Sequence, residues 1–301
     1  MRRWVCACMA AGCVAALVAG CGGSAPTSPT KGTGGNQQLP PPSNHPPVIQ
    51  SITVQGTRTR EPAGYADVKE TVRVAAVVTD EETPVDQLLY AWSAAAGTFA
   101  GTGAKVTWTA PADAQTPASV ALTLKVTEKY GQPGGPLVYS QDVSGAATVS
   151  LHDSVKEVGD LARQFLLDFS DSRITDVDYI LRNFTTSTDA CASGTANEHD
   201  DVAKNRVDYR INTSSIGAAD VSVEFGGTCA FRGRPGDACA EVPSQWHSTR
   251  LTGGGPEPIG APERADGIDQ VTAIYLASSG QWGLCASDFN GVVKPNSTFI
   301  R

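Results

Sequence analysis

The chain has 301 residues, which is enough for two ordinary domains. Its net charge of −8 comes from 31 acidic and 23 basic residues that are interspersed, with no block of Lys or Arg. That pattern argues against nucleic acid as a partner and against a polybasic contact with lipid headgroups. We therefore expect no nucleic-acid partner.

The N-terminal segment, residues 1–20, is typical of an export signal. Two arginines precede an apolar run from Trp4 to Ala19 that is too short to span a bilayer comfortably. The run ends in Leu17-Val18-Ala19-Gly20-Cys21, which resembles the lipobox of bacterial lipoproteins. The resemblance implies that the signal is removed and that Cys21 becomes an acylated N-terminus. An ordinary secretory signal with an incidental cysteine is the alternative.

We therefore predict a protein of the bacterial cell envelope, periplasmic or surface-exposed, whose membrane contact is the lipid on Cys21. The choice between inner and outer membrane stays open. Residues 21–47 continue as a tether rich in Gly, Ser, Thr, Pro, Gln and Asn. Such a composition buries too little apolar surface to fold, so we expect this tether to be disordered.

Residues 48–150 show the period of two that is typical of strands. Short apolar-alternating stretches are separated by turns rich in Gly, Pro and Asp, which predicts an all-β sandwich. The alternating stretches are residues 72–79, 88–92, 106–108, 120–126 and 143–149.

The same region resembles bacterial Ig-like and PKD-like domains. The resemblance is carried by Asn44-His45-Pro46-Pro47-Val48-Ile49, Val78-Thr79-Asp80, Leu89-Tyr90-Ala91-Trp92-Ser93 and Val106-Thr107-Trp108-Thr109-Ala110-Pro111. It implies a sandwich with a central tryptophan that acts as a spacer or adhesive module. An acidic turn containing Asp80, Glu82 and Asp86 is a weak candidate for Ca²⁺, and a solvated turn is the alternative. Otherwise we expect no metal and no cofactor.

Residues 151–301 begin with helical signals. Ser154-Val155-Lys156-Glu157 reads as a capping box followed by apolar residues at helical spacing, and Thr175-Asp176-Val177-Asp178 starts a second predicted helix. Polar or Gly/Pro-rich loops are expected over 186–204 and 252–268. Helices followed by strands indicate an α+β domain with its helices on one face of a curved antiparallel sheet. The predicted strands contain Val207 to Ile211, Val221 to Phe225, Cys229 to Arg232, Trp246 to Leu251, and a final hairpin across Ser278-Ser279-Gly280.

This order of elements, with the last strand Gln281-Trp282-Gly283-Leu284, resembles the NTF2-like superfamily, whose fold is a cystatin-like α+β cone. The resemblance implies a pocket between helices and sheet. Aromatic residues of the predicted strands are the candidates for its lining, and packing in the core is their alternative role. These residues are Tyr209, Trp246, Tyr275 and Trp282.

The four cysteines of the C-terminal half suggest two disulfides in an exported protein. Cys229 and Cys239 flank a turn and can face each other across a hairpin, which leaves Cys191 for Cys285. Three connectivities are possible, and we favour this one. The spacing shows no zinc motif.

Three functional hypotheses follow from these features. The first is a non-enzymatic lipoprotein that binds an envelope protein or a small molecule. The second is a pocket enzyme of hydrolase or dehydratase type, and the third is a structural or adhesive spacer. No nucleophile elbow or phosphate-binding loop is present, so no catalytic residue is assigned. Glu198-His199-Asp200-Asp201 is acidic and contains a histidine, but residues adjacent in a predicted loop seldom converge on one atom.

Overall fold

The computed structural model describes residues 41–252 and 258–295, which belong to one compact unit. It is 51% strand and 16% helix, so the expectation of a mostly β fold with several sheets is confirmed. The predicted signal segment, Cys21 and most of the predicted tether lie outside the described residues. Within residues 41–252 and 258–295, no helix has the length and apolar character that crossing a bilayer requires.

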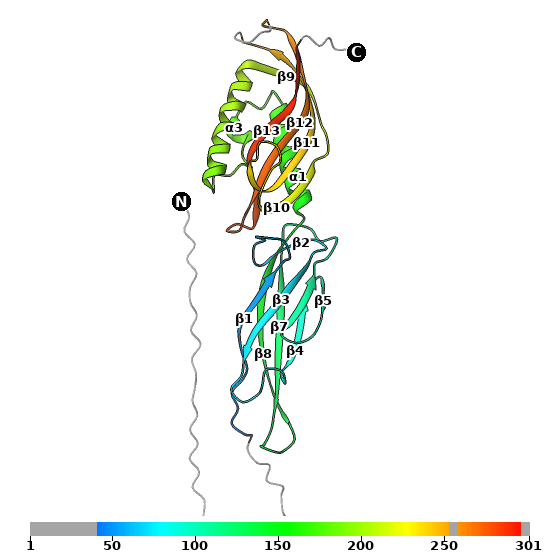
Figure 1. The fold of residues 1–301 in the computed structure, drawn as a ribbon, viewed down its shortest axis with the longest axis vertical. Coiled ribbons are helices and arrows are strands. Elements are labelled where there is room, and N and C mark those ends of the chain that lie inside the picture. The colour runs from blue at the N-terminus through cyan, green and yellow to red at the C-terminus, as the bar shows by residue number, and fades with distance from the viewer. Residues whose placement is uncertain (1–40, 253–257, 296–301) are drawn as a thin grey trace, which may run out of the picture. The chain divides into compact units, whose positions relative to one another are not determined.

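Eight strands form two four-stranded sheets in the first part of this unit (Figure 1). One sheet has the order β1-β3-β6-β5 and the other β2-β8-β7-β4, and every pairing is antiparallel except β2 with β8. The strands are β1 (Val48–Gln55), β2 (Tyr65–Asp67), β3 (Thr71–Thr79), β4 (Leu89–Ala94), β5 (Thr98–Ala100), β6 (Lys105–Thr109), β7 (Ala118–Tyr130) and β8 (Tyr139–His152).

The apolar alternation of these strands makes the core between the two sheets. In β3 every second residue is buried, and Val72 and Val74 have essentially no exposed surface. Trp108 is completely buried, and its Nε1 donates to the carbonyl of Ala96 at 3.1 Å. Gly97 has a φ of 78°, and a Cβ there would lie 2.5 Å from Trp108 Nε1. Only glycine therefore lets the chain turn this close to the ring.

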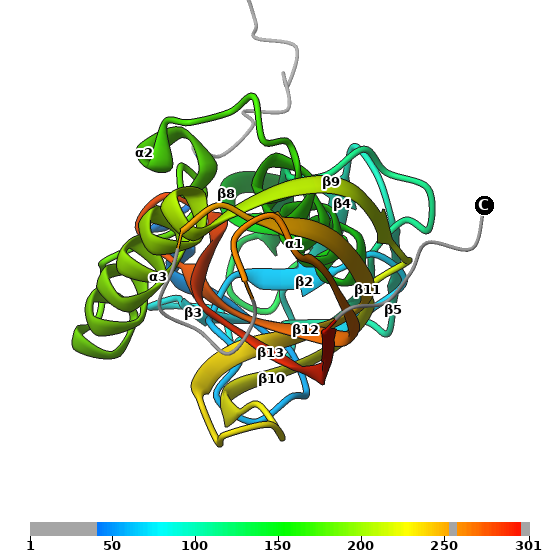
Figure 2. The same ribbon diagram turned by 90° about the horizontal axis from the view of Figure 1, so that it is seen from above.

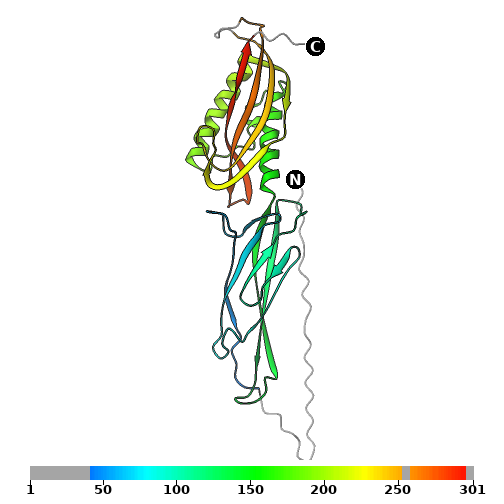
Figure 3. The ribbon, with the colours of Figure 1, turned by 45° about the vertical axis from the view of Figure 1, so that its right-hand side comes forward.

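In the second part of the unit, the residues that the structure describes (151–252 and 258–295) form three helices and one five-stranded antiparallel sheet. β11 is long enough to pair with β10 along its first half and with β9 along its second, and β12 and β13 extend the sheet (Figure 3). Figure 2 shows the sheet curving around α1, with α3 beside β13. The elements are α1 (Ser154–Ser170), α2 (Val177–Ile180), α3 (Asp189–Asp208), β9 (Tyr209–Ile216), β10 (Asp220–Thr228), β11 (Pro235–Arg250), β12 (Pro262–Leu276) and β13 (Gln281–Pro295).

Helix α1 follows the predicted apolar spacing, but it is capped one residue earlier than predicted. Asp153 is the N-cap, and its side chain accepts from the N–H of Lys156. Glu157 accepts from the N–H of Asp153, so the cap resembles a capping box whose returning side chain comes from N4 in place of N3. Ser154 is instead bound to the carboxylate of Asp67 in β2.

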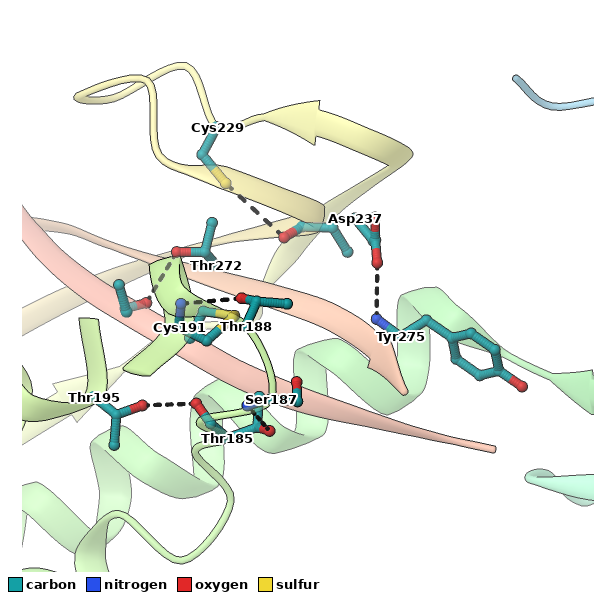
Figure 4. Close-up of a disulfide and its surroundings, with 12 residues drawn as sticks. Thr185, Ser187, Thr188, Cys191, Thr195, Cys229, Asp237, Thr272 and Tyr275 are labelled. Atoms are coloured by element: carbon teal, nitrogen blue, oxygen red, sulfur yellow. Dashed lines mark hydrogen bonds between the residues drawn. A yellow bond between two sulfur atoms is a disulfide. The ribbon is translucent and has the colours of Figure 1, made fainter. Parts of the chain in front are cut away.

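Helix α3 corrects the expectation of a polar loop over 186–204. Thr188 is its N-cap and accepts from the N–H of Cys191, and Thr195 donates to the carbonyl of Thr185 (Figure 4). Only Cys191, Gly194 and Val202 are buried in its 20 residues. A helix with so narrow an apolar stripe shows little periodicity, which is why the pattern indicated a loop.

Three strand boundaries also differ from the prediction. Val207 belongs to α3, Cys229 to Arg232 form the turn before β11, and β12 begins at Pro262 inside the expected 252–268 loop. Pairing with β11 and β13 determines where β12 begins, so the Gly/Pro-rich composition before it was a poor guide. The final hairpin is as predicted, with Leu276 opposite Gln281.

The described residues contain two disulfides, and their connectivity is the one favoured from the sequence. Cys191 of α3 is bonded to Cys285 of β13, 94 residues away. Cys229 is bonded to Cys239 across the turn that precedes β11. The first disulfide attaches a mostly polar helix to the sheet, and the second closes the turn.

Candidate functional site

A cavity of about 360 Å³ lies between the two longer helices and the concave face of the sheet. Its volume falls in the range of small-molecule sites. Aromatic and aliphatic side chains make up most of its wall, together with several carboxylates. The lining residues are Phe165, Leu166, Phe169, Glu198, Asp201, Val202, Asn205, Tyr209, Ile211, Trp246, Ser248, Glu263, Ala265, Asp269, Ser287, Phe289 and Val293.

The strands supply this lining through their alternation. Along β12, Glu263, Ala265 and Asp269 share the concave face because they are separated by even numbers of residues. Gly267 lies between them on the same face, opposite Gly291 of β13. A Cβ on Gly267 would lie 2.9 Å from the Phe289 ring. The missing side chain therefore leaves room for Phe289 in the cavity wall.

The helices close the other side. The cavity-lining residues of α3 are Glu198, Asp201, Val202 and Asn205, which recur at intervals of three and four residues on one helical face. Helix α1 adds Phe165 and Phe169, and the Phe169 ring meets Trp246 of β11 edge to face, with 5.3 Å between centroids. Helix and sheet thus contribute both the aromatic wall and the polar groups.

Asp269 is a buried carboxyl group on the floor of the cavity, with 6% of its surface exposed. Ser244 donates to its Oδ2, and Trp246 Nε1 donates to Ser244 Oγ at 3.0 Å. Burial raises the pKa of Asp269 to about 6, although the hydrogen bonds from Ser244 and Trp246 favour its charged form.

Glu198 has the larger shift. Burial raises its pKa to about 8, and the negative charges of Asp201, Asp269 and Asp288 add to the effect. The N–H of Ser287 donates to Glu198 Oε2 at 3.1 Å, which opposes the shift. Glu198 is therefore mostly protonated at neutral pH, and its acidity responds to the charge of whatever enters the cavity.

The neighbouring cations are engaged with other groups. Arg250 lies 3.6 Å from Glu263, and Arg232 and Arg234 both bind Asp288, at 3.0 and 2.7 Å. Arg206 of α3 donates to three carbonyls at the C-terminal end of α1. The charged side chains in the described lining of the cavity are carboxyl groups, whereas Arg206 keeps its positive charge beside the cavity, with its guanidinium 5.4 Å from the centroid of the Phe169 ring.

The structure brings two of the four predicted pocket residues into this cavity and not the other two. Tyr209 and Trp246 line it. Tyr275 and Trp282 pack in a separate aromatic cluster with Phe225 and Tyr65, with ring centroids 4.8 to 6.5 Å apart. They lie near the hairpin end of β12 and β13, whereas the cavity uses positions further along these strands.

Within residues 41–252 and 258–295, Asp80, Glu82 and Asp86 of the calcium candidate are not brought together as one group of ligand atoms. Asp80 accepts hydrogen bonds from the backbone N–H groups of Glu82 and Thr83, as an Asx turn does. Glu82 Oε1 lies 2.6 Å from Nδ1 of His45, and this hydrogen bond raises the pKa of His45. In the described residues, the group with ligand atoms close together is His45, Glu81 and Glu82, which excludes Asp80 and Asp86. This group is exposed and held by an ion pair.

Sequence reasoning missed Glu198, Asp201 and Asp269 as site residues. The first two were dismissed because Glu198-His199-Asp200-Asp201 was placed in a loop, where its side chains would not converge. Of these four residues of α3, Glu198 and Asp201 line the cavity, whereas His199 and Asp200 do not and are exposed. The threonine cap at Thr188 and the recurrence of Glu198, Asp201 and Asn205 at helical spacing were the available signals.

The chain was compared with protein-family models, curated proteins and solved structures. No family model matches the chain, and neither curated proteins nor solved structures include a match.

Proposed function

We propose that this chain is a lipid-anchored protein of the bacterial cell envelope whose C-terminal domain binds a small molecule. In this proposal the C-terminal domain is NTF2-like and the β-sandwich before it is an Ig-like or PKD-like spacer. The cavity between α1, α3 and the concave sheet carries the proposal. It favours binding over a purely structural or adhesive role, and the lipobox-like residues around Cys21 support the location.

A thermal-shift screen of a broad small-molecule library tests this function without a guess about chemistry. The full chain is exported so that both disulfides form, and it is purified in detergent. A ligand that binds the native state raises the melting temperature by linkage. We expect reproducible hits whose effect is lost in Trp246→Ala and Tyr209→Ala.

The matched control is Tyr179→Ala, because Tyr179 is an exposed aromatic residue of α2 outside the cavity. It should respond to the hits as the parent chain does. A broad screen without a hit, or hits that persist in both cavity variants, would contradict small-molecule binding in this cavity.

A pocket enzyme is the second candidate, and one observation favours it. Glu198 and Asp269 place two carboxyl groups with raised pKa values in one cavity, as acid–base catalysis requires. Incubating each hit with the protein, followed by mass spectrometry, separates the two functions. An enzyme would convert a hit, and Glu198→Gln or Asp269→Asn would stop conversion while binding persisted. A hit recovered unchanged identifies a binding protein.

A further inference from the structure

We propose that the cavity selects ligands that carry a protonated amine on an aromatic or aliphatic body. This inference rests on the proposed function, since it names the chemical class of ligand for the same cavity. It is carried by the charge of the lining, by its unused hydrogen-bond acceptors and by the rings around them.

The charge of the lining is the first argument. Glu198, Asp201, Glu263 and Asp269 line the cavity, and the described lining residues include no Lys, Arg or His. Arg250 pairs with Glu263, while Glu198, Asp201 and Asp269 form no ion pair within residues 41–252 and 258–295. A cation entering this space would be attracted, whereas an anion would meet like charges inside a partly desolvated site.

The second argument is a buried hydrogen-bond acceptor in the lining that receives no hydrogen bond. Oδ1 of Asn205 is buried and has no hydrogen-bond partner in the described structure, although Asn205 lines the cavity. An unpaired buried acceptor is costly, so a donor from a ligand would stabilise it. An ammonium group has three N–H donors and no acceptor. It therefore offers a donor to Asn205 and further donors to carboxyl groups of the same lining.

The positions of Glu198 and Asp269 add to this argument. They come from different elements, α3 and β12, and the negative charge of Asp269 raises the pKa of Glu198. A cation between these elements would reverse that effect and favour both carboxylates. Asp201 and Asp288 are further acidic groups near Glu198, and Arg232 and Arg234 neutralise Asp288.

The rings define the rest of the ligand. Phe165, Phe169, Trp246 and Phe289 surround the carboxyl groups with apolar surface. Aromatic faces attract cations and bury apolar groups, so one wall serves both parts of an amine with an apolar body.

Three phenethyl probes of similar size test the proposal. They are phenethylamine, 2-phenylethanol and 3-phenylpropionate, which present a cation, a neutral hydroxyl and an anion on the same ring. Dissociation constants are measured by calorimetry or ligand-observed NMR on the full chain in detergent at pH 8.5. We expect phenethylamine to bind at least tenfold more tightly than 2-phenylethanol, and 3-phenylpropionate to bind most weakly.

The double variant Glu198→Gln/Asp269→Asn should weaken phenethylamine at least tenfold and leave 2-phenylethanol within about twofold. Asp200→Asn is the matched control, because Asp200 is an exposed carboxylate on the same helix outside this cavity. It should change neither affinity by more than about twofold. Retained binding of 2-phenylethanol shows that the double variant is folded.

The affinity for phenethylamine should also rise several-fold between pH 6.5 and 8.5. Glu198 loses its proton over that range, while an alkylamine stays protonated as Lys does. The variant Glu198→Gln should remove most of the slope.

The possible failures are distinguishable. Equal affinity for the amine and the alcohol, tighter binding of the anion, or no probe bound at 10 mM would overturn the ligand class. The small-molecule function would stand if the broad screen still gave hits sensitive to Trp246→Ala. If that screen also gave none, the function itself would fail.

Discussion

At the scale of single residues, Glu198 and Asp269 show how burial raises the pKa of ordinary carboxyl groups. Each lies among apolar rings and accepts a hydrogen bond from a neighbour, yet the loss of water outweighs those bonds. Sequence composition does not reveal this. The turn near Asp80 has as many acidic residues in its sequence, but these side chains accept hydrogen bonds from the backbone or pair with a histidine at the surface.

The raised pKa of Glu198 predicts how stability depends on pH. The folded chain keeps a proton on Glu198 up to about pH 8, whereas the unfolded chain loses it near pH 4.5. The folded state therefore binds more protons between these values, and the free energy of unfolding falls as pH rises through the window. Asp269 contributes in the same direction between pH 3.8 and about 6.

We expect Glu198→Gln to remove most of this dependence. At pH 9 the variant should be more stable than the parent by on the order of 2 kcal/mol, since one pKa unit corresponds to about 1.4 kcal/mol and Glu198 keeps some contact with water. At pH 4.5 the two should be nearly equal. Urea unfolding at both pH values measures the difference, with Asp200→Asn as the control. A parent and variant that differ equally at both pH values would show that Glu198 is not protonated by burial.

At the scale of elements, α3 owes its place to a few close contacts with β13. Most of its surface is polar and exposed. It is attached to the sheet by the disulfide Cys191–Cys285 and by close packing at Gly194, which has no side chain. A Cβ on Gly194 would lie 2.3 Å from the carbonyl oxygen of Cys285 and 3.1 Å from Cβ of Ala286. The helix can approach the strand this closely only without a side chain there.

Gly194→Ala should therefore destabilise the protein by about 1–3 kcal/mol through overpacking. In an ordinary helix the same change stabilises by about 1 kcal/mol, so the sign of the effect is diagnostic. Ser193→Ala, at the neighbouring exposed position, is the control and should be neutral or slightly stabilising. Thermal and urea unfolding report the difference. A stabilising Gly194→Ala would mean that α3 does not approach β13 as described.

The two disulfides should differ in their contribution to stability because they close loops of different length. Cys191–Cys285 spans 94 residues and Cys229–Cys239 spans 10. In the loop-entropy account, replacing the first pair with serine costs about 4–5 kcal/mol and replacing the second about 2–3 kcal/mol. Urea unfolding of the two paired variants ranks these costs. The opposite ranking would indicate that contacts of the 229–239 turn outweigh loop closure.

At the scale of the whole molecule, the proposal assigns membrane anchoring and ligand binding to different parts of the chain. The lipid on Cys21 would hold the chain at a membrane, and the cavity lies far along the sequence, between residues 165 and 293. No cavity residue belongs to the predicted signal or tether. A screen on detergent-purified protein should therefore report ligand binding in the cavity although the anchor is held in detergent.

The anchor is tested by Cys21→Ala. We expect the variant to lose labelling by a fatty-acid analogue and to move from the membrane fraction to the soluble fraction, because no acyl chain is attached. Cys13→Ala, within the predicted signal, is the matched control and should keep both properties. A Cys21→Ala protein that stays labelled would contradict the lipobox interpretation.

The sequence by itself determined those features that depend on neighbouring residues. The alternation through Val72 and Val74 predicts a buried strand, the spacing through Val158 and Phe165 predicts α1, and the turn between Cys229 and Cys239 predicts a disulfide. These patterns are local, because strand and helix periods place residues on a face whatever they pack against.

Only the tertiary structure decided which residues share the cavity. Glu198 and Asp269 are 71 positions apart, and their meeting depends on the curvature of the sheet and on the attachment of α3 to β13. Tyr275 and Trp282 have the same aromatic, alternating pattern as Trp246, yet they lie further toward the hairpin and pack with Tyr65 and Phe225. Alternation specifies the face of a strand, but the position along that face relative to the helices is settled by packing across the whole domain.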